Sequence, residues 1–294
     1  MKKRVGYQGV PGAYSSIAAR EAFPRLPSVG FPTFDETVAA LQGGDVAYAL
    51  LPIENSTSGR VADMHHLLPG SGLTIIGEHF LPIHHCLIGL KGASRDDIRH
   101  IYSHREALNQ CRDYIRSLGA EAVPYGDTAA AVDHIANLED PHVAALASRL
   151  AAERSEKVRI IERDVEDRSD NVTRFLILTK GGSMRPPKTG DSLTSIVFET
   201  RDVPAALFKS LAGFATAGTN IIKLESFVPM AAHTHASFYL EFEGTPDAQL
   251  QRIALEELGH YTRSVTILGC YPKSLYRKRF EAQVDKKRYS RRNP

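Results

Sequence analysis

The sequence predicts an α/β protein with a larger part in two halves, built on largely parallel sheets, and a smaller ferredoxin-like C-terminal module. Three observations predict this. Over the first 180 residues, short apolar and often β-branched segments alternate with stretches whose apolar residues recur at helical spacing. A run rich in Gly, Pro, Lys and Ser then marks a linker at 180–190. The residues after it change rhythm, and their elements follow the order βαββαβ.

In the larger part, the strands are expected at 5–7, 46–51, 73–76, 86–90, 101–102, 122–123, 143–146 and 175–179. The helices are expected at 15–22, 37–42, 106–118, 128–138 and 148–152. Ser103 is the candidate N-cap of the helix at 106–118, and Gly119 stops that helix. The long extended segment 78–89 predicts a crossover between two separate βα sets.

In the smaller part, strands are expected at 195–199, 220–228, 236–243 and 265–268, and helices at 204–216 and 246–258. Pro204 opens the first of these helices. The chain is therefore divided into a larger domain at 1–182, with crossovers near 78–89 and 170–178, a linker at 183–192, a module at 193–272 and a basic tail at 273–294.

Composition excludes several classes of protein. The chain has 294 residues, 43% of them apolar and 24% charged, which is ordinary for a globular protein. No apolar run approaches the roughly 18 residues that a membrane span needs, and the basic N-terminus leads directly into a strand without a signal-like apolar region. The three cysteines (Cys86, Cys111 and Cys270) form no CxxC pair, which suits a reducing compartment. We expect a cytoplasmic protein that does not contact a membrane.

The charge is uneven along the chain. The tail at 273–294 holds nine Lys or Arg side chains against Glu281 and Asp285, whereas the whole chain has a net charge of only +2. Such a tail can contact nucleic acid, but a solvated terminus is the favoured interpretation, because no other basic patch or helix-turn-helix pattern accompanies it.

Two segments place polar groups where α/β sheets collect ligands. The stretch 6–15 is a strand followed by a glycine-rich turn that opens a helix, a geometry that suits an anion. It lacks the spacing of a nucleotide-binding loop, so a tight turn without a ligand is an equal alternative. The stretch 51–59 follows a buried-type strand with five consecutive polar residues, which favours a binding role over a simple helix cap.

The segment 170–175 and the paired histidines are further candidates. Thr173 precedes Arg174, which suits carboxylate recognition, and an aromatic residue, Phe175. The histidine pairs at 65–66, 84–85 and 233/235 raise the question of a metal, but adjacent histidines on a strand point to opposite faces, so a metal site is disfavoured. No sequence pattern of a serine hydrolase or a zinc protease is present.

Read together, these segments resemble the prephenate dehydratase family over about 5–271. Six stretches match the family's motifs in order: 9–15, 52–59, 103–111, 127–131, 144–151 and 171–175. Val10 and Ala13 depart mildly from the first motif. Residues 194–271 resemble the ACT domain that commonly follows in this family. The resemblance implies a catalytic domain of two lobes, similar to type II periplasmic binding proteins, with the active site in the cleft between the lobes.

The family's reaction converts prephenate to phenylpyruvate, water and carbon dioxide, with no metal or organic cofactor. The resemblance implies that Thr173 is the key catalytic residue, hydrogen bonding to the departing oxygen or relaying a proton to it. The substrate carboxylates would be held by Arg174 and by backbone N–H groups near Gly12 or Ser56. The residues implied around the cleft are Asn55, Ser56, Thr57, Ser103, Gln110, Thr128, Ser148, Arg174 and Phe175.

The ACT-like part departs from the family at its effector motifs. The family carries Gly-Ala-Leu and Glu-Ser-Arg-Pro; this chain has Ala205-Ala206-Leu207 and Glu225-Ser226-Phe227-Val228-Pro229. With Asn220, these residues keep a pocket for L-phenylalanine plausible, and a homodimer or homotetramer is expected. Two alternatives stay open: an arogenate dehydratase, and a two-lobed binding protein for amino acids or keto acids that has no catalytic activity.

Overall fold

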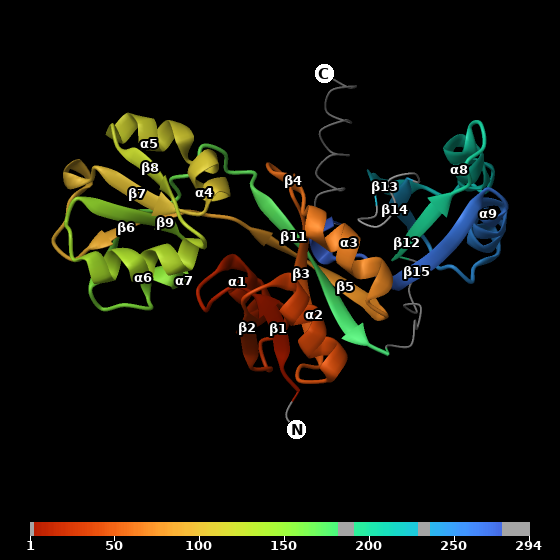
Figure 1. Ribbon diagram of the computed structural model, residues 1–294, viewed down its shortest axis with the longest axis horizontal. Helices are drawn as coiled ribbons and strands as arrows, with labels where there is room; N and C mark the ends of the chain where they lie inside the picture. Colours follow the sequence, from red (N-terminus) through yellow and green to blue (C-terminus); the bar gives the residue numbers. More distant parts are fainter. Residues whose placement is uncertain (1–2, 182–190, 229–235, 278–294) are drawn as a thin grey trace, which may run out of the picture. The chain divides into compact units, whose positions relative to one another are not determined.

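The computed structural model describes residues 3–181, 191–228 and 236–277 (Figure 1). They fall into two compact units, one of residues 1–61 and 80–175 and the other of residues 62–79 and 176–294. Most of the predicted linker, Pro229, the histidines at 233 and 235, and the tail after Arg277 lie outside the described residues. Within those residues, no helix is long and apolar enough to cross a membrane.

The first sheet has the strand order β2-β1-β3-β11-β5, with β4 paired to β3. Its strands are β1 (Val5–Gln8), β2 (Ser28–Phe31), β3 (Tyr48–Asn55), β4 (Gly59–Arg60), β5 (Leu73–Pro82) and β11 (Val172–Lys180). β1 pairs in parallel with β2 and β3. The sequence of β3 is apolar without alternation, and Leu50, Leu51 and Ile53 are buried, as expected for a strand covered on both faces.

Helices α1 (Tyr14–Ala22) and α2 (Phe34–Gly43) pack against this sheet (Figure 1). α2 begins where the Thr33 hydroxyl accepts a hydrogen bond from the Glu36 backbone N–H, and it ends at Gly44 in a left-handed conformation with φ 85°. A polar N-cap and a C-terminal glycine are the usual boundaries of a short helix.

The second sheet has the order β10-β6-β9-β7-β8. Its strands are β6 (Cys86–Leu90), β7 (His100–Ser103), β8 (Glu121–Pro124), β9 (Val143–Ala147) and β10 (Val158–Glu162). α6 (Thr128–Leu138) packs on one face, where Val132 and Ile135 meet Ile88 and Ala145. α4 (Arg105–Gln110) and α5 (Arg112–Leu118) cover the other, where Leu108 and Ile115 meet Leu146. α7 (Arg149–Ala152) follows β9.

The two sheets share one strand order. The order β2-β1-β3-β11 in the first sheet corresponds to β8-β7-β9-β6 in the second, and the last strand of each series comes from a segment that crosses over from the other sheet. These last strands are β6, which follows β5, and β11, which follows β10. The segments that lead to them are tied together by the Ile83 N–H to Asn171 carbonyl bond (2.9 Å) and the Val165 N–H to His85 carbonyl bond (3.0 Å). The expected two-lobed α/β organisation is confirmed.

Several local predictions need correction. The helix expected at 106–118 is two helices, broken at Cys111. Its N-cap is His104, whose ring accepts from the Glu106 N–H, and not Ser103. Ser103 instead ends β7, where its buried hydroxyl donates to the Leu146 carbonyl at 2.6 Å. Helix α3 (Ala62–Gly70) and strands β2, β4 and β10 were not predicted from the sequence.

The second unit contains the βαββαβ module that the sequence predicts. Its elements are β12 (Ser192–Thr200), α8 (Ala206–Thr216), β13 (Ile221–Phe227), β14 (Ser237–Glu243), α9 (Gln249–His260) and β15 (Thr262–Pro272). The antiparallel sheet has the order β13-β14-β12-β15. Phe198, Leu240 and Phe242 bury one face against α8 and α9, which contribute Phe214 and Leu258. α8 begins after Pro204, so this proline is not its first residue.

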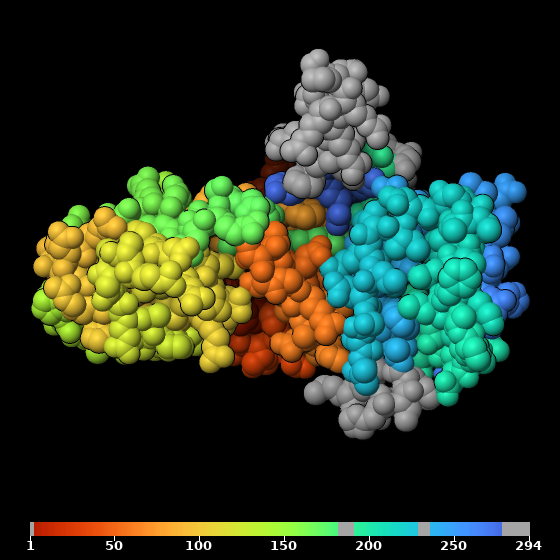
Figure 2. All heavy atoms as spheres, turned by 90° about the horizontal axis from the view of Figure 1, so that it is seen from above, coloured from red at the N-terminus to blue at the C-terminus, as the bar shows by residue number. Residues whose placement is uncertain are grey.

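The other face of this sheet packs against α3 and the start of β5, which belong to the same unit (Figure 2). The ring centroids of His65 in α3 and Tyr239 in β14 lie 5.2 Å apart. Gly269 in β15 lies so close to β5 that an added Cβ atom would stand 2.1 Å from the Ile75 carbonyl oxygen. Only glycine permits this approach of the two backbones.

Candidate active site

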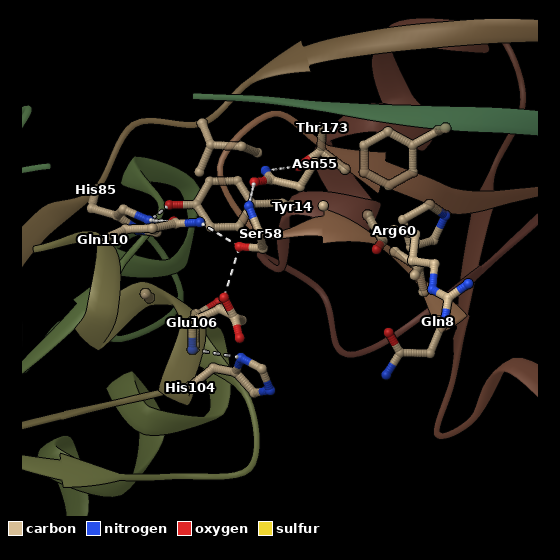
Figure 3. Close-up of a pocket in the computed structure, with 18 of the residues that line it drawn as sticks. Gln8, Tyr14, Asn55, Ser58, Arg60, His85, His104, Glu106, Gln110 and Thr173 are labelled. Atoms are coloured by element: carbon tan, nitrogen blue, oxygen red, sulfur yellow. Dashed lines mark hydrogen bonds between the residues drawn. The ribbon is translucent and has the colours of Figure 1, made fainter. Parts of the chain in front are cut away.

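A cavity of about 460 Å³ lies within the first unit, between its two sheets (Figure 3). Polar side chains reach it from the ends of several elements. They include Tyr14 and Ser15 at the start of α1, Asn55 at the end of β3, Ser58 after it, Arg60 on β4, His85 between the sheets, Glu106 and Gln110 on α4, Thr128 at the start of α6, and Thr173 on β11. Pro52, Ile83 and Phe175 add apolar surface. The site thus combines a few placed polar groups with an apolar wall, as ligand pockets do.

The Thr173 side chain is held by Asn55, which Asn171 in turn orients. The Asn55 side-chain N–H group donates to the Thr173 hydroxyl oxygen at 2.9 Å and to the Asn171 side-chain oxygen at 2.8 Å. The other end of the Asn55 amide accepts from the Thr57 N–H, the Thr57 hydroxyl and the Ser58 N–H. The Thr173 hydroxyl oxygen accepts the hydrogen bond from Asn55, and within the described residues its proton is donated to no protein atom.

Gln110 joins this turn to the opposite lobe. Its amide N–H group donates to the Thr57 hydroxyl at 3.0 Å and to the Ser58 hydroxyl at 3.2 Å. Its oxygen accepts from the Asn171 side-chain N–H at 2.9 Å and lies 2.8 Å from the His85 Nε2 atom. Because that oxygen can only accept, the His85 Nε2 atom carries the proton.

Tyr14 completes the chain. Its hydroxyl lies 2.7 Å from the His85 Nδ1 atom and 2.8 Å from the His84 carbonyl oxygen. The Tyr14 hydroxyl has one proton, and it donates that proton to the His84 carbonyl oxygen. The Nδ1 atom of a neutral His85 protonated at Nε2 is a second acceptor, so the two acceptors share the Tyr14 proton. Burial lowers the pKa of His85, which keeps the ring neutral, and burial raises the pKa of Tyr14, which keeps the phenol protonated. A continuous set of hydrogen bonds therefore runs from Tyr14 to Thr173.

The predicted site residues divide into two groups. Asn55, Gln110, Thr128, Thr173 and Phe175 line the cavity. Thr57 lines an adjoining cavity of about 300 Å³, which shares the Ser58, Glu106 and Gln110 side chains with the first.

Ser56, Ser103, Ser148 and Arg174 do not line the cavity that Thr173 lines. Ser148 lines a separate cavity of about 510 Å³ in the same unit. The Ser56 hydroxyl donates to the Asp170 carbonyl and accepts from the Val172 N–H, each at 2.9 Å. Ser148 caps α7 and donates to the Gly12 carbonyl at 2.6 Å. These serines, with Ser103 on β7, hold backbone segments in place, which explains small hydroxyl residues at these positions without substrate contact.

Arg174 is the main correction among the expected contacts. Its side chain is 1% exposed, forms an ion pair with Glu54 at 3.0 Å and lies over the ring of Phe80. Alternation along β11 explains this, because Thr173 and Phe175 point to the cavity side and the residue between them points away. The Ser56 N–H is also committed, to the Val172 carbonyl at 2.9 Å. The predicted role of these two groups in holding a carboxylate is therefore not supported.

Tyr14, Arg60, His85 and Glu106 line the cavity and were not chosen from the sequence. Arg60 directly follows the Pro52–Gly59 motif, so its place near a ligand could have been predicted from the sequence. Glu106 and Gln110 are four residues apart on α4, a spacing that places both on one helical face. His85 gives no comparable signal, since only the tertiary structure brings it to Gln110.

The glycine-rich turn at 9–12 precedes α1, whose first residues, Tyr14 and Ser15, line the cavity. Gly9 and Gly12 have φ values of 109° and 92°, and an added Cβ atom at Gly12 would lie 3.1 Å from the Ala151 Cα atom. The turn thus packs closely against α7 of the opposite lobe, and glycine is needed for that approach. The Gly12 carbonyl is occupied by Ser148.

His84, from one of the histidine pairs in the sequence, lies close to two acidic side chains. The His84 Nδ1 atom lies 2.7 Å from Glu166 and 3.7 Å from Asp164. Both carboxylates come from the return segment some 80 residues later in the chain, so no local spacing predicted them. Glu166 also accepts from the His85 N–H at 2.8 Å, so it anchors the two crossing segments to each other.

The comparison with known families gives the chain its identity. The model of the family described as "Prephenate dehydratase" matches residues 5–183. The chain belongs to the prephenate dehydratase family. It is 39% identical over 275 residues to the Bifunctional N-acyl-homoserine lactone acylase/prephenate dehydratase of Komagataeibacter europaeus, covering 94% of this chain and 98% of that one.

Two further relatives match more than nine tenths of the chain. Arogenate dehydratase/prephenate dehydratase 1, chloroplastic, of Arabidopsis thaliana is 36% identical over 290 residues, covering 94% of this chain and 74% of the relative. The crystal structure of the prephenate dehydratase of Arthrobacter aurescens in complex with L-Phe is 27% identical with a TM-score of 0.84, covering 92% of this chain and 90% of that one. The chain is thus an enzyme of the prephenate dehydratase family, and its cavity is the candidate active site.

The predicted effector residues lie in the second unit. Ala205 caps α8 with φ 58°, and Ala206 and Leu207 form the first turn of that helix. The Asn220 carbonyl accepts from the Glu243 N–H at 3.0 Å, just before β13. Glu225 and Ser226 lie in β13, which is an edge strand of the four-stranded sheet. Glu225 pairs with Lys223 at 3.4 Å.

Proposed function

We propose that this dehydratase converts prephenate to phenylpyruvate, water and carbon dioxide. The observation that carries the proposal is the Thr173 hydroxyl. It lines the cavity, Asn55 holds its oxygen as an acceptor, and its proton stays available to a ligand. A hydroxyl so oriented is a donor for an oxygen on which negative charge develops.

The reaction needs little covalent participation from the protein. The bond between the ring and its carboxylate breaks, and its electron pair joins the ring as carbon dioxide leaves. The ring C–O bond breaks with its electrons on oxygen, which takes up one proton and departs as water. Thr173 stabilises the departing oxygen by hydrogen bonding, and the proton comes from solvent directly or through this hydroxyl. Aromatisation supplies the driving force.

The rest of the cavity suits this substrate. Arg60 is a guanidinium on its wall, and we assign it to a substrate carboxylate in place of the buried Arg174. Thr128 adds a hydroxyl to the wall at the start of α6, where the Asp127 carboxylate already accepts from the Ala129 and Ala130 N–H groups. Phe175 offers an apolar surface to the ring.

A spectroscopic assay of phenylpyruvate formation from prephenate tests the proposal. We expect turnover by the purified full chain, and Thr173→Ala provides the matched inactive control. Binding of prephenate without any product would instead support the non-catalytic binding protein. Because the Komagataeibacter europaeus relative's name also includes a lactone acylase, an N-acyl-homoserine lactone is included as a second substrate.

L-Phenylalanine is the proposed effector of the βαββαβ module, which resembles an ACT domain. Support comes from the module's strand order and from the Arthrobacter aurescens structure, which is a complex with L-Phe. We expect phenylalanine to bind and to inhibit, with substrate and effector weakening each other's binding reciprocally. Titration calorimetry without heat, together with unchanged rates at millimolar phenylalanine, would contradict this and leave the module a role in assembly.

We also propose that the module supports a homodimer or homotetramer. Phe208 on α8 is 77% exposed and Leu250 on α9 is 53% exposed, and contact with a second copy would remove these apolar side chains from water. Light scattering of the full chain should give at least the mass of a dimer, and Phe208→Ser should lower it. Leu138→Ser, at a 46% exposed site on α6, is the control that should not change the mass. A monomeric wild-type chain would refute the proposal.

A further inference from the structure

Glu106 places a carboxylate on the wall of the candidate active site. Its Oε2 atom accepts a hydrogen bond from the Ser58 hydroxyl at 2.7 Å. Its side chain forms no ion pair with any Lys, Arg or His of the described residues, although the chain contains many such pairs elsewhere. Glu106 borders both the cavity that Thr173 lines and the adjoining smaller one. A cavity wall therefore carries a negative charge that the protein leaves available to a ligand.

The carboxylate is connected to the proposed chemistry by short contacts. The Ser58 N–H donates to the Asn55 side-chain oxygen at 2.9 Å, and the Asn55 side-chain N–H donates to Thr173 at 2.9 Å. Ser58 thus links Glu106 to the residue that orients Thr173. Figure 3 shows Glu106 on the wall formed by α4, and Thr173 and Arg60 on other sides of the cavity. A ligand that reaches Thr173 with its ring can extend a substituent toward α4.

The charge on this wall distinguishes the two substrates left open above. Prephenate and arogenate carry the same ring, hydroxyl and ring carboxylate; they differ in the side chain, where arogenate has an ammonium group in place of the keto oxygen. A carboxylate attracts the ammonium group and repels the dianionic keto acid. An enzyme selective for prephenate alone gains nothing from an unpaired carboxylate at this place.

Resting on the proposed function, we propose that Glu106 is a specificity-determining residue that binds the α-ammonium group of arogenate, so that the site accepts the amino-acid substrate. Glu106 stabilises the bound substrate and its transition state alike, because the ammonium group does not react. Its effect should accordingly appear mainly in KM.

The test compares kcat/KM for both substrates in the wild-type chain and in Glu106→Gln, which keeps the size and the Ser58 contact but removes the charge. Phenylpyruvate is measured for prephenate, and initial rates of L-phenylalanine release for arogenate. We expect the arogenate-to-prephenate ratio of kcat/KM to fall about fivefold, as for a partly solvated ion pair. Glu106→Lys should lower the ratio further.

The matched control is Glu156→Gln, which makes the same charge change at an exposed position of the same lobe outside the cavity, and which should leave the ratio unchanged. Added salt should raise the arogenate KM of the wild type more than that of Glu106→Gln. A ratio that stays within twofold in both Glu106 variants would overturn the inference while leaving the proposed function standing. Absence of turnover on both substrates in the wild type would overturn the proposed function itself.

Discussion

The Asn55 side-chain nitrogen lies 2.9 Å from the Thr173 hydroxyl oxygen, and its second proton reaches the Asn171 side-chain oxygen at 2.8 Å. Both protons of one amide group are thereby committed, and Thr173 has a fixed orientation. The two residues stand 118 positions apart in the chain and belong to neighbouring strands β3 and β11. This pair sets the geometry on which the proposed chemistry depends.

Thr173→Ala should lower kcat by about 10²–10³ with a small change in KM, because the lost hydrogen bond acts mainly in the transition state. Steady-state kinetics with prephenate measure this. Thr173→Ser retains the hydroxyl and the Asn55 contact, so it should lose far less. If Thr173→Ala keeps more than about half of the wild-type kcat, the assignment is wrong.

His85→Gln should make stability less sensitive to acid. Burial lowers the pKa of His85, so between that pKa and about 6.5 the unfolded state binds more protons than the folded state. The His85 contribution to folding is complete above about pH 6.5 and declines as the pH falls through this window. The groups that face the ring, Tyr14, Gln110 and Glu166, remain in the variant.

Urea unfolding at pH 7.5 and pH 5 measures this effect. The wild type should lose more unfolding free energy than His85→Gln between the two pH values. His100→Gln, at a half-exposed position of β7, is the control that should behave like the wild type. Equal losses in wild type and His85→Gln would show that His85 titrates alike in both states.

Ala205→Gly should stabilise the protein by about 1 kcal/mol. Ala205 is the N-cap of α8 and has φ 58°, a left-handed conformation that costs an alanine about 1–2 kcal/mol and a glycine almost nothing. Urea unfolding gives the change. Ala212→Gly, in the interior of the same helix, should destabilise by about 1 kcal/mol. Destabilisation of the same size by both substitutions would argue against strain at Ala205.

Arg277 and Glu78 should be strongly coupled. The Arg277 guanidinium donates to both Glu78 carboxylate oxygens at 2.9 and 3.1 Å, and the Glu78 side chain is fully buried. Arg277→Met leaves that carboxylate without its guanidinium and should cost about 3 kcal/mol. Glu78→Gln combined with Arg277→Met should cost less than the sum of the single changes. A double-mutant cycle by urea unfolding measures this, and additive effects would contradict the coupling.

The sequence by itself determined the α/β class, the βαββαβ order of the second part and the polar segments after β3 and before β11. Periodicity, glycine turns and apolar runs are local properties, so they can be read from neighbouring residues. Asn55 and Thr173 could be named because they stand in the matched motifs of the family.

Only the tertiary structure decided what those residues touch. Arg174 and Thr173 are neighbours in sequence, yet they point to opposite faces of the strand. Arg174 is buried in an ion pair with Glu54, whereas Thr173 lines the cavity. His85 and Glu106 reach the site because two crossing segments and a helix from the second lobe bring them there. Such contacts join residues 25 to 118 positions apart, so the pattern of neighbouring residues in the sequence does not predict them.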